Sequence, residues 1–340
     1  MNKILTIIIP TYNMEKYLRR CLDSLIIDEE SMKKLEVLVI NDGSKDSSSQ
    51  IAHEYQDKYP DTYRVIDKDN GNYGSCINRG LKEATGKYIK VLDADDYFDN
   101  LSVSKYQECL KNINADLIIT NYNIVDESGR ITRENISKMN PMEIYNADNI
   151  INTPTFDLIQ MHAFTYNRHV FDNLNYHQTE GISYTDQEWI FTPMANVNTI
   201  VSLPLNIYQY FVGRIGQTMD PAVLLRSLGH TEKGTLSMLS SYKQLRVNEA
   251  KNTFLKKRIL NRLNYIYTKY LLDSASADLK DLQKFDNIIK EKYPAIYSES
   301  NNLIAAKKMP FKYVKHWRKT QRTERSILNK LLIRYYNITK

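Results

Sequence analysis

The chain has 340 residues, enough for one large α/β domain and a smaller appendage. Hydrophobic residues make up 42% and charged residues 25%, which excludes a disordered polymer and a multi-span membrane protein. The net charge of +6 is uneven: residues 306–340 carry eleven lysines and arginines against one acid, a net +10, which leaves −4 for the other residues. Three cysteines are too few for a disulfide framework or a zinc cluster, which favours a reducing compartment.

The N-terminal segment places Lys3 before an apolar run, as a signal peptide would. Pro10 ends that run early and no small-residue cleavage site follows. No uninterrupted apolar stretch elsewhere approaches the roughly 18 residues of a membrane span. We therefore expect a cytoplasmic protein without a transmembrane helix.

The first hundred residues alternate between two hydrophobic periodicities. Short apolar runs predict strands over residues 4–9, 35–40, 63–66 and 88–92. Apolar residues at helical spacing lie between them, and Gly86 ends the helix predicted over residues 75–85. Such alternation predicts a parallel sheet with right-handed crossovers, in which ligands bind at the carboxyl ends of the strands.

The pattern loosens after residue 100. Strands are predicted over residues 116–120 and near 158–166, and a strand-like run ends at Phe211. From residue 224 to about 293, Leu, Ile and Tyr recur at helical intervals, and no strand is predicted past Pro221.

Three carboxylates directly follow the fourth predicted strand, at Asp93, Asp95 and Asp96. Such acids repel one another unless a cation lies between them, and Mg²⁺ and Mn²⁺ favour oxygen ligands. Taken alone, a bare Asp-x-Asp is weak evidence for a metal site and favours a solvated turn in which an Asp caps a helix. Polar residues at the ends of the other strands favour a binding crevice, and they occupy residues 10–13, 41–44 and 70–75.

In order and spacing, these motifs resemble the family 2 glycosyltransferases with the GT-A nucleotide-sugar fold. The matching segments are Ile7–Asn13, Val39–Ser44, Asn70-Gly71, Asn78-x-Gly80, Gly86–Ile89 and Leu92–Asp96. The resemblance implies an α/β fold of GT-A type: a Rossmann-like mixed sheet flanked by helices, with a helical C-terminal extension. It implies a catalytic domain over residues 1–220, with a nucleotide-binding half (1–100) and an acceptor half (101–220), followed by a helical region over 221–340.

The resemblance also implies roles for individual residues. Thr11, Tyr12 and Asp42 match the positions that hold the nucleoside base, with Asp42 accepting a hydrogen bond from uracil. Asp93 matches the ribose-binding carboxylate, and Asp95 the ligand of a Mg²⁺ or Mn²⁺ ion on the donor diphosphate. The remaining expected donor-binding residues of this half are Pro10, Asn13, Asn70, Gly71, Asn78 and Ala94. Ile77 departs from the pattern, because many relatives carry arginine there, so phosphate neutralisation would fall more heavily on the metal.

The second half is expected to supply a general base, because inverting glycosyl transfer requires a carboxylate that takes the proton of the acceptor hydroxyl. Asp186 matches the family's catalytic carboxylate, and Glu180 and Glu188 are the alternatives. Thr185 and Glu188 also have the spacing of a capping box, in which Asp186 would be a first-turn acid favoured by the helix dipole. The two interpretations are compatible, because a helix start is a rigid mount for a base.

A polar segment after Phe211 and two aromatic side chains each allow a functional and a structural interpretation. Arg214, Gln217 and Thr218 match a loop expected to close over the diphosphate and exclude water, and an ordinary surface loop is the alternative. His162 and Trp189 are interpreted as packing or acceptor-shelf residues.

The basic tail interleaves its cations with apolar residues, which predicts basic amphipathic helices lying on an anionic membrane. Nucleic-acid binding and a solvated or partner-docking helix are the alternatives, and we expect no nucleic acid. The apolar residues concerned are Phe311, Tyr313, Val314, Trp317, Ile327, Leu328, Leu331, Leu332 and Tyr335.

Taken together, the sequence predicts an inverting, metal-dependent transferase that moves a sugar from a UDP-sugar to a hydroxyl of a lipid-linked or polysaccharide acceptor. The setting would be surface polysaccharide or glycoconjugate biosynthesis at the inner face of the cell membrane. A nucleotidyltransferase would require a basic phosphate-binding loop after the first strand, and residues 10–13 contain no lysine or arginine. An inactive sugar-nucleotide-binding scaffold would not require Asp93, Asp95 and Asp186 together.

Overall fold

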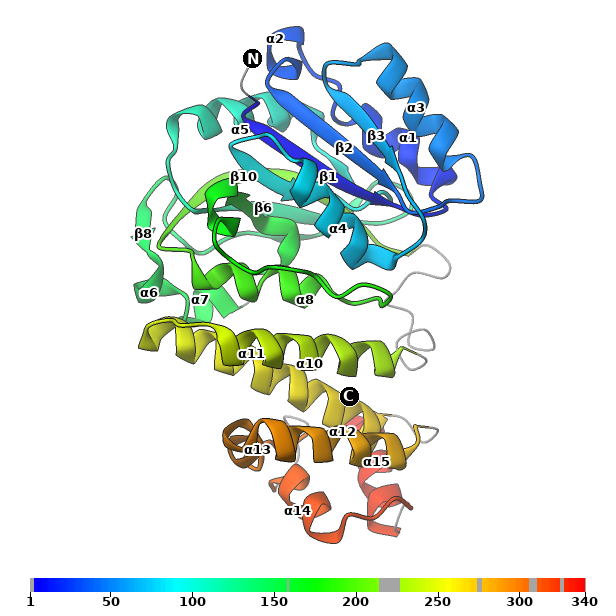
Figure 1. Ribbon diagram of the computed structural model, residues 1–340, viewed down its shortest axis with the longest axis vertical. Helices are drawn as coiled ribbons and strands as arrows, with labels where there is room; N and C mark the ends of the chain where they lie inside the picture. The colour runs from blue at the N-terminus through cyan, green and yellow to red at the C-terminus, as the bar shows by residue number, and fades with distance from the viewer. Residues whose placement is uncertain are drawn as a thin grey trace. The chain divides into compact units, whose positions relative to one another are not determined.

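The computed structural model describes residues 3–157, 159–213, 227–273, 277–305, 311–324 and 327–339. The chain divides into two compact units, Met1–Gln217 and Thr218–Lys340, each of which is described by itself (Figure 1). The boundary expected after residue 220 falls within residues 214–226, which lie outside the described part of the chain.

The first half of unit 1 is a parallel sheet with the strand order β3-β2-β1-β4. Its strands are β1 (Leu5–Thr11), β2 (Leu35–Asn41), β3 (Tyr63–Asp67) and β4 (Tyr88–Val91). The helices between them are α1 (Glu15–Asp23), α2 (Glu29–Met32), α3 (Ser48–Lys58) and α4 (Asn72–Glu83). These elements confirm the four strands predicted from the apolar runs, and their carboxyl ends lie at one edge of the sheet because they are parallel.

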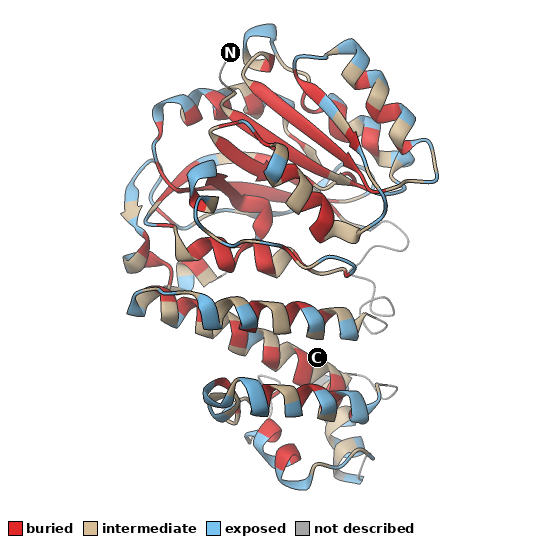
Figure 2. Cartoon of the chain, in the orientation of Figure 1, coloured by how far each residue is buried: buried red, intermediate tan, exposed pale blue. Residues whose placement is uncertain are grey.

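Burial explains why these strands read as continuous apolar runs. Every residue of β2 is buried, and Ile7, Ile8 and Ile9 of β1 are fully buried (Figure 2). Helix α4 packs directly on β1, since a Cβ atom at Gly80 would lie 2.5 Å from the Ile8 side chain. Glycine at this position therefore sets the close approach of the helix to the sheet.

The second half of unit 1 makes the sheet mixed. Strands β6 (Leu117–Val125) and β10 (Thr199–Phe211) pair in parallel, while β9 (Phe164–Asn167) lies antiparallel to both β4 and β6. Strands β5 (Tyr97–Phe98) and β8 (Ile144–Asn146) pair antiparallel with β10, and β7 (Ile131–Asn135) with β6. The strand predicted near residues 158–166 is shorter and later than expected, because the 3₁₀ helix η1 (Met161–Ala163) precedes it.

Helix α5 and several shorter helices lie in the remaining connections of unit 1. They are α5 (Asn100–Asn112), α6 (Ala147–Ile150), α7 (Pro154–Asp157), η2 (Arg168–Phe171), α8 (Asp186–Trp189) and η3 (Thr192–Ala195). Helix α8 carries the predicted base, Asp186, at its first position.

Unit 2 is helical throughout its described residues, as predicted. Its elements are α10 (Leu228–Gln244), α11 (Glu249–Thr268), the π-helix η4 (Lys269–Asp273), α12 (Leu279–Lys292), α13 (Pro294–Ser300), α14 (Tyr313–Thr320) and α15 (Ile327–Thr339). Within the described ranges, no helix combines the length and the apolarity that crossing a membrane requires.

Helix α14 corrects part of the interpretation of the tail. Tyr313, Val314 and Trp317 are buried in the core of unit 2. Arg318 is buried too, and its guanidinium lies 2.8 Å from Asp286. The prediction that these apolar side chains lie on a membrane is therefore wrong, because they already pack against their own unit.

Candidate functional site

The loops that follow β1 and β2 are tied to each other at the carboxyl edge of the sheet. The Asp42 amide donates to the Thr11 carbonyl at 2.8 Å. The Asn13 amide donates to Ser44 Oγ at 3.0 Å, and its side-chain oxygen accepts from the Lys45 amide at 2.8 Å. Asn13 has a φ of 54°, a left-handed conformation that asparagine tolerates better than most residues. These bonds place Thr11 and Asn13 beside Asp42, as the sequence predicted.

Asp42 is the centre of a set of converging donors. Its Oδ1 atom accepts from Lys68 Nζ at 2.5 Å, from the Gly71 amide at 2.9 Å and from Ser75 Oγ at 3.4 Å. The Asn70 side chain donates to its backbone carbonyl at 3.0 Å. The three hydrogen bonds to this carboxylate that have described distances fall on Oδ1, and the Cys76 thiol also interacts with the carboxylate. The sequence predicted Asp42, Asn70 and Gly71, but it gave no sign of Lys68.

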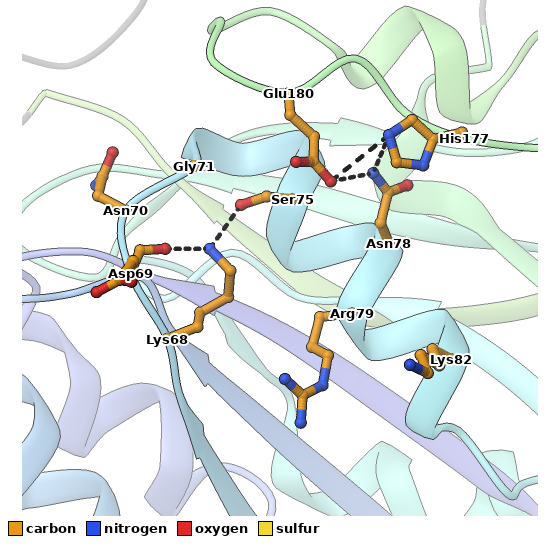
Figure 3. Close-up of a pocket in the computed structure, with 10 residues that line it drawn as sticks. All are labelled: Lys68, Asp69, Asn70, Gly71, Ser75, Asn78, Arg79, Lys82, His177 and Glu180. Atoms are coloured by element: carbon orange, nitrogen blue, oxygen red, sulfur yellow. Dashed lines mark hydrogen bonds and ion pairs between the residues drawn. The ribbon is translucent and has the colours of Figure 1, made fainter.

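A polar cavity of about 520 Å³ lies beside helix α4. Its lining includes three predicted donor residues, Asn70, Gly71 and Asn78 (Figure 3). The other lining residues are Lys68, Asp69, Ser75, Arg79, Lys82, His177 and Glu180. Ile77, which replaces a common arginine, is buried. Three cations, Lys68, Arg79 and Lys82, therefore line this cavity although Ile77 supplies no charge.

The acidic cluster after β4 is held by tyrosine hydroxyls. Asp93 accepts a hydrogen bond from the Tyr73 hydroxyl at 2.8 Å, and its amide donates to the Tyr208 hydroxyl at 3.2 Å. Burial raises the pKa of Tyr73 well above its ordinary value, and the charge of Asp93 raises it further. Burial likewise raises the pKa of Tyr208 well above its ordinary value, so both hydroxyls are neutral: Tyr73 donates to the Asp93 carboxylate, and Tyr208 accepts from the Asp93 amide.

Asp96 is the member of the cluster with the most clearly structural contacts. It accepts from the Tyr208 hydroxyl at 2.6 Å and from the Phe211 amide at 2.8 Å, so it fastens β10 to the loop after β4. Burial raises the pKa of Asp96 well above its ordinary value, and the nearby Asp95 and Asp93 charges act in the same direction. The sequence showed the acid but not its partners on β10.

Asp95 is buried beside an arginine that the sequence analysis did not single out. The backbone carbonyl of Asp95 accepts from Arg20 at 2.8 Å. The Arg20 guanidinium lies 4.5 Å from the ring centroids of Tyr97 and Phe211. Arg20 therefore fixes the loop through its backbone, and the role of the Asp95 carboxylate as a metal ligand stays a prediction.

His162 lies close to the acids although it precedes β9 in the sequence. Asp93, Asp96 and His162 offer ligand atoms that all lie within 4.8 Å of one another. The imidazole stacks on Tyr210 with ring centroids 4.4 Å apart, and its buried Nδ1 atom has no hydrogen-bond partner among the described residues. Burial lowers the pKa of His162 to about 3, so the ring is neutral. The packing interpretation of His162 is correct as far as its neighbours go, but it misses this proximity to the acids.

Asp186 opens helix α8, but the capping box predicted around it is wrong. Thr185 makes no side-chain capping bond, and Glu188 instead accepts from the Thr179 amide at 2.9 Å. Asp186 accepts from Gln187 Nε2 at 2.9 Å. Tyr184, two residues before Asp186, has a φ of 64°, a costly conformation for a bulky residue.

Electrostatics links Asp186 to the acids of the first half. Burial raises the pKa of Tyr73, and the charges of Asp93 and Asp186 both add to that effect. Burial likewise raises the pKa of Tyr210, with contributions from the same two carboxylates. The charges of carboxylates from both halves of unit 1 thus act on the same two tyrosines.

The side chain of Asn78 holds the loop that precedes Asp186. Its amide nitrogen donates to the Gln178 carbonyl at 2.9 Å and its oxygen accepts from the Gln178 amide at 2.8 Å. The buried Gln178 side chain donates to the Thr185 carbonyl at 2.7 Å. Glu180, an alternative base, also accepts from Asn78, at 2.9 Å. Hydrogen bonds through Gln178 therefore connect Asn78 to Thr185, the residue that precedes the candidate base.

Several predicted residues take no part in these contacts or cannot be placed. Tyr12 is exposed, Ala94 is buried in the acidic loop and Pro10 pairs in register with Ile40. Arg214, Gln217 and Thr218, the expected diphosphate loop, lie outside the described residues.

Comparisons with known proteins agree with this arrangement. The model of the family described as glycosyl transferase family 2 matches residues 6–174. The uncharacterized glycosyltransferase MG025 homolog of Mycoplasma pneumoniae is 39% identical over 119 residues, which cover 34% of this chain and 38% of that protein. Glycosyltransferase GlyA of Streptococcus pneumoniae is 34% identical over 126 residues, which cover 36% of this chain and 17% of that protein. The matches thus span well under half the length of these relatives.

Solved structures match over nearly the whole chain. Residues 1–349 of TarS from S. aureus, in complex with UDP-GlcNAc, align with a TM-score of 0.68 and 20% identity, covering 99% of this chain and 92% of that one. The same TarS fragment in complex with UDP aligns with a TM-score of 0.65 and 18% identity, over the same shares of the two chains. This likeness confirms the expected fold, a GT-A mixed sheet flanked by helices with a helical C-terminal part.

Proposed function

The chain belongs to glycosyl transferase family 2 through residues 6–174, and we propose that it transfers a sugar from a UDP-sugar to a hydroxyl of a glycan or lipid-linked acceptor. The observation that carries this proposal is that the charges of acids from both halves, Asp93 and Asp186, raise the pKa of the same two tyrosines, Tyr73 and Tyr210, and that Tyr73 also donates a hydrogen bond to Asp93. TarS binds UDP-GlcNAc and UDP on the same fold, which supports a uridine donor.

In this proposal the base and ribose of the donor lie along the carboxyl edge of the sheet. Asp42 presents Oδ2 to the N3–H of uracil, while Lys68, Gly71 and Ser75 hold Oδ1. Asp93 accepts from the ribose hydroxyls, and Tyr73 fixes its orientation. Because these donors already orient both carboxylates, little reorganisation accompanies donor binding.

The acidic loop fits a divalent ion, since Asp93 and Asp95 offer the oxygen ligands that Mg²⁺ and Mn²⁺ prefer. An ion bound there would neutralise charge on the departing nucleoside diphosphate as a Lewis acid. Lys68, Arg79 and Lys82 add positive charge on the flank of α4.

Asp186 is the proposed general base. It takes the proton from the acceptor hydroxyl while that oxygen attacks the anomeric carbon from the face opposite the leaving diphosphate, which inverts the anomeric configuration. The Gln178 side chain donates to the carbonyl of Thr185, the residue before the base, and Asn78 of α4 donates to the Gln178 carbonyl. These two hydrogen bonds hold the backbone next to Asp186.

Calorimetry of UDP binding, with and without Mn²⁺, tests the donor site in the parent protein and in Asp95→Asn. We expect Mn²⁺ to strengthen UDP binding in the parent protein. In Asp95→Asn, Mn²⁺ should strengthen UDP binding much less. The same UDP affinity under all four conditions would contradict a role for the ion in donor binding.

For the setting of the reaction, the proposal includes peripheral attachment to an anionic membrane through helix α15. Ile327, Leu331, Tyr335 and Ile338 recur at helical spacing and are 47–79% exposed. The exposed Lys330 and Arg334 lie on the same helix, and residues 327–339 contain no acid. An apolar stripe flanked only by cations is complementary to an anionic lipid surface.

Co-sedimentation with vesicles that contain phosphatidylglycerol tests this attachment. Removing both cations in Lys330→Gln/Arg334→Gln should weaken binding about 30-fold, since each contributes about 1 kcal/mol near such a surface. The matched variant Lys315→Gln/Lys319→Gln changes two exposed cations of α14 and should bind nearly as the parent does.

Two results would overturn the attachment through α15. The first is an equal loss of vesicle binding in both double variants, which would mean that only net charge matters. The second is a parent protein that dimerises in solution and becomes monomeric in Leu331→Ser, because the stripe would then be an interface between two copies of the chain.

A further inference from the structure

A row of aromatic side chains lies next to the acidic loop and ends in the half-buried Tyr210. Tyr208 and Tyr210 are two residues apart on β10, so their side chains lie on the same face of the sheet. Tyr208 is buried, and its hydroxyl donates to Asp96 at 2.6 Å. Strand β10 runs in the same direction as β4, so Tyr210 lies one step nearer the edge of the sheet at which the acidic loop begins.

The imidazole of His162 covers one face of the Tyr210 ring. The two rings are stacked, with centroids 4.4 Å apart and an interplanar angle of 23°. Tyr208 and Tyr122 hold the imidazole in turn, with ring centroids 4.8 Å and 5.4 Å from its own. These three supporting side chains are buried, whereas Tyr210 is not. The accessible part of Tyr210 therefore belongs to its other face and its edge, and the ring stands on a packed support.

His162 also connects this ring to the acids. One side-chain atom each of His162, Asp93 and Asp96 lies within 4.8 Å of the others, and the Tyr210 ring stacks directly on that imidazole. Burial raises the pKa of Tyr210, and the charges of the acidic loop and of Asp186 raise it further, so its hydroxyl is neutral. Tyr210 therefore presents an uncharged, partly accessible ring beside the acidic loop.

The proposed order of the donor along the sheet edge indicates which of its groups reaches this ring. Uracil is assigned to Asp42 and ribose to Asp93, and the diphosphate follows at the acidic loop. The sugar comes last in the molecule, where the acceptor and Asp186 must also approach its anomeric carbon. A pyranose exposes C–H groups on its faces and hydroxyls on its rim. An aromatic face with carboxylates nearby matches both kinds of surface.

We propose that Tyr210 is the platform for the transferred sugar, with its accessible ring face packed against the C–H groups of the pyranose. The inference rests on the proposed function, since it requires a UDP-sugar bound along this edge of the sheet. It adds a specificity-determining residue to that function, because an axial hydroxyl on the stacked face of a sugar would hold that face away from a flat ring. Hydrophobic periodicity did not single out Tyr210, which belongs to an ordinary strand-like run ending at Phe211.

Calorimetry without acceptor tests the platform, with UDP, UDP-glucose, UDP-galactose and UDP-N-acetylglucosamine as the probes in the presence of Mn²⁺. The measured quantity is the affinity for each UDP-sugar divided by the affinity for UDP, so that contacts with uracil, ribose and diphosphate cancel. An aromatic contact changes affinity about 2- to 12-fold. For the UDP-sugar that the parent binds most tightly, this ratio should fall by that factor in Tyr210→Leu. It should stay near the parent value in Tyr210→Phe, which keeps the ring.

Tyr145→Leu is the matched control, because Tyr145 is also half-buried but pairs with Ile200 at the amino end of β10. It should leave the ratio at the parent value. Saturation-transfer NMR gives a second readout on the same proteins. When aromatic protein protons are irradiated, the signals of the sugar C–H protons, relative to those of uracil, should be weaker in Tyr210→Leu than in the parent.

The outcomes separate this inference from the function on which it rests. A ratio that stays at the parent value in Tyr210→Leu overturns the platform, whether or not UDP itself binds more weakly. An equal fall of the ratio in Tyr145→Leu, or equal relative NMR signals in Tyr210→Leu and the parent, overturns it as well. A parent protein that binds none of the four nucleotides would instead contradict the proposed function.

Discussion

Lys68 provides a sharp test of how the donor site is organised. Its ammonium group lies 2.5 Å from Asp42 Oδ1, and the two side chains are only 19% and 3% exposed. Lys68→Met keeps the length and apolar volume of the side chain but removes the charge. Asp42 would then keep the Gly71 amide and the Ser75 hydroxyl as donors but would lose its cation.

The size of the effect follows from the kind of bond removed. A hydrogen bond to a charged group contributes about 1.5–3 kcal/mol. At about 1.4 kcal/mol for each factor of ten, full transfer of that loss to donor binding would weaken UDP about 10- to 150-fold. Asp42 is buried in the unliganded protein as well, so removing Lys68 also lowers the free energy of unfolding and not only the affinity for UDP. We therefore expect UDP binding to weaken by a factor near the lower end of this range.

Calorimetry with UDP and CDP in the presence of Mn²⁺ measures the effect on base recognition. Uracil offers an N3–H donor to Asp42, whereas neutral cytosine has an acceptor at N3, so the preference for UDP over CDP should shrink in Lys68→Met. Lys82→Met is the matched control, because Lys82 lines the same cavity and has no described contact with Asp42. An equal reduction of the preference for UDP over CDP in the two variants, or an unchanged preference in Lys68→Met, would refute the assignment of Asp42 to the base.

Three further outcomes are expected. Asp186→Asn should keep UDP affinity within a few-fold and lower steady-state turnover by about 10² or more, the scale of lost acid–base assistance; parent-like turnover would transfer the role to another carboxylate. Arg318→Met should lower the urea-derived free energy of unfolding by about 3–5 kcal/mol, because it leaves Asp286 buried without its partner, whereas Lys319→Met on the exposed face should change it little. Burial raises the pKa of Glu232 from 4.5 to about 7, so between these pH values the folded state binds more protons than the unfolded state and the protein becomes less stable as pH rises. In Glu232→Gln, this decrease of the thermal unfolding temperature between pH 4.5 and 7 should be smaller than in the parent protein. The same dependence on pH in both proteins would contradict the prediction.

The sequence predicted the first half of the fold well because its signals are local. Continuous apolar strands such as β2 are buried on both faces, and the polar residues after each strand follow from parallel topology. Periodicity could not supply the antiparallel insertion of β9 between β4 and β6, because strand order depends on contacts far apart in the sequence. The resemblance to a family anticipated that mixed sheet.

The sequence predicted the site residues that belong to short sequence motifs. It could not predict those whose roles depend on contacts between residues far apart in the chain. Asp42 and Asp93 stand in recognisable strings, whereas Lys68, Tyr208 and His162 gain their roles only through tertiary contacts. In the tail, by contrast, the sequence pattern predicted more exposed apolar surface than the structure has. Its amphipathic pattern is real, but periodicity cannot distinguish a face that packs on its own unit, as in α14, from one that remains exposed, as in α15.

The central claim is that this chain cleaves and transfers sugar from a uridine-linked donor. The most direct measurement is Mn²⁺-dependent release of nucleoside diphosphate from a panel of nucleotide sugars, by the parent protein and by Asp186→Asn. The account predicts release of UDP from at least one UDP-sugar by the parent, and a loss of about 10² or more in Asp186→Asn while UDP still binds. Binding of UDP-sugars without any release, or formation of pyrophosphate from UTP and a sugar phosphate, would contradict it.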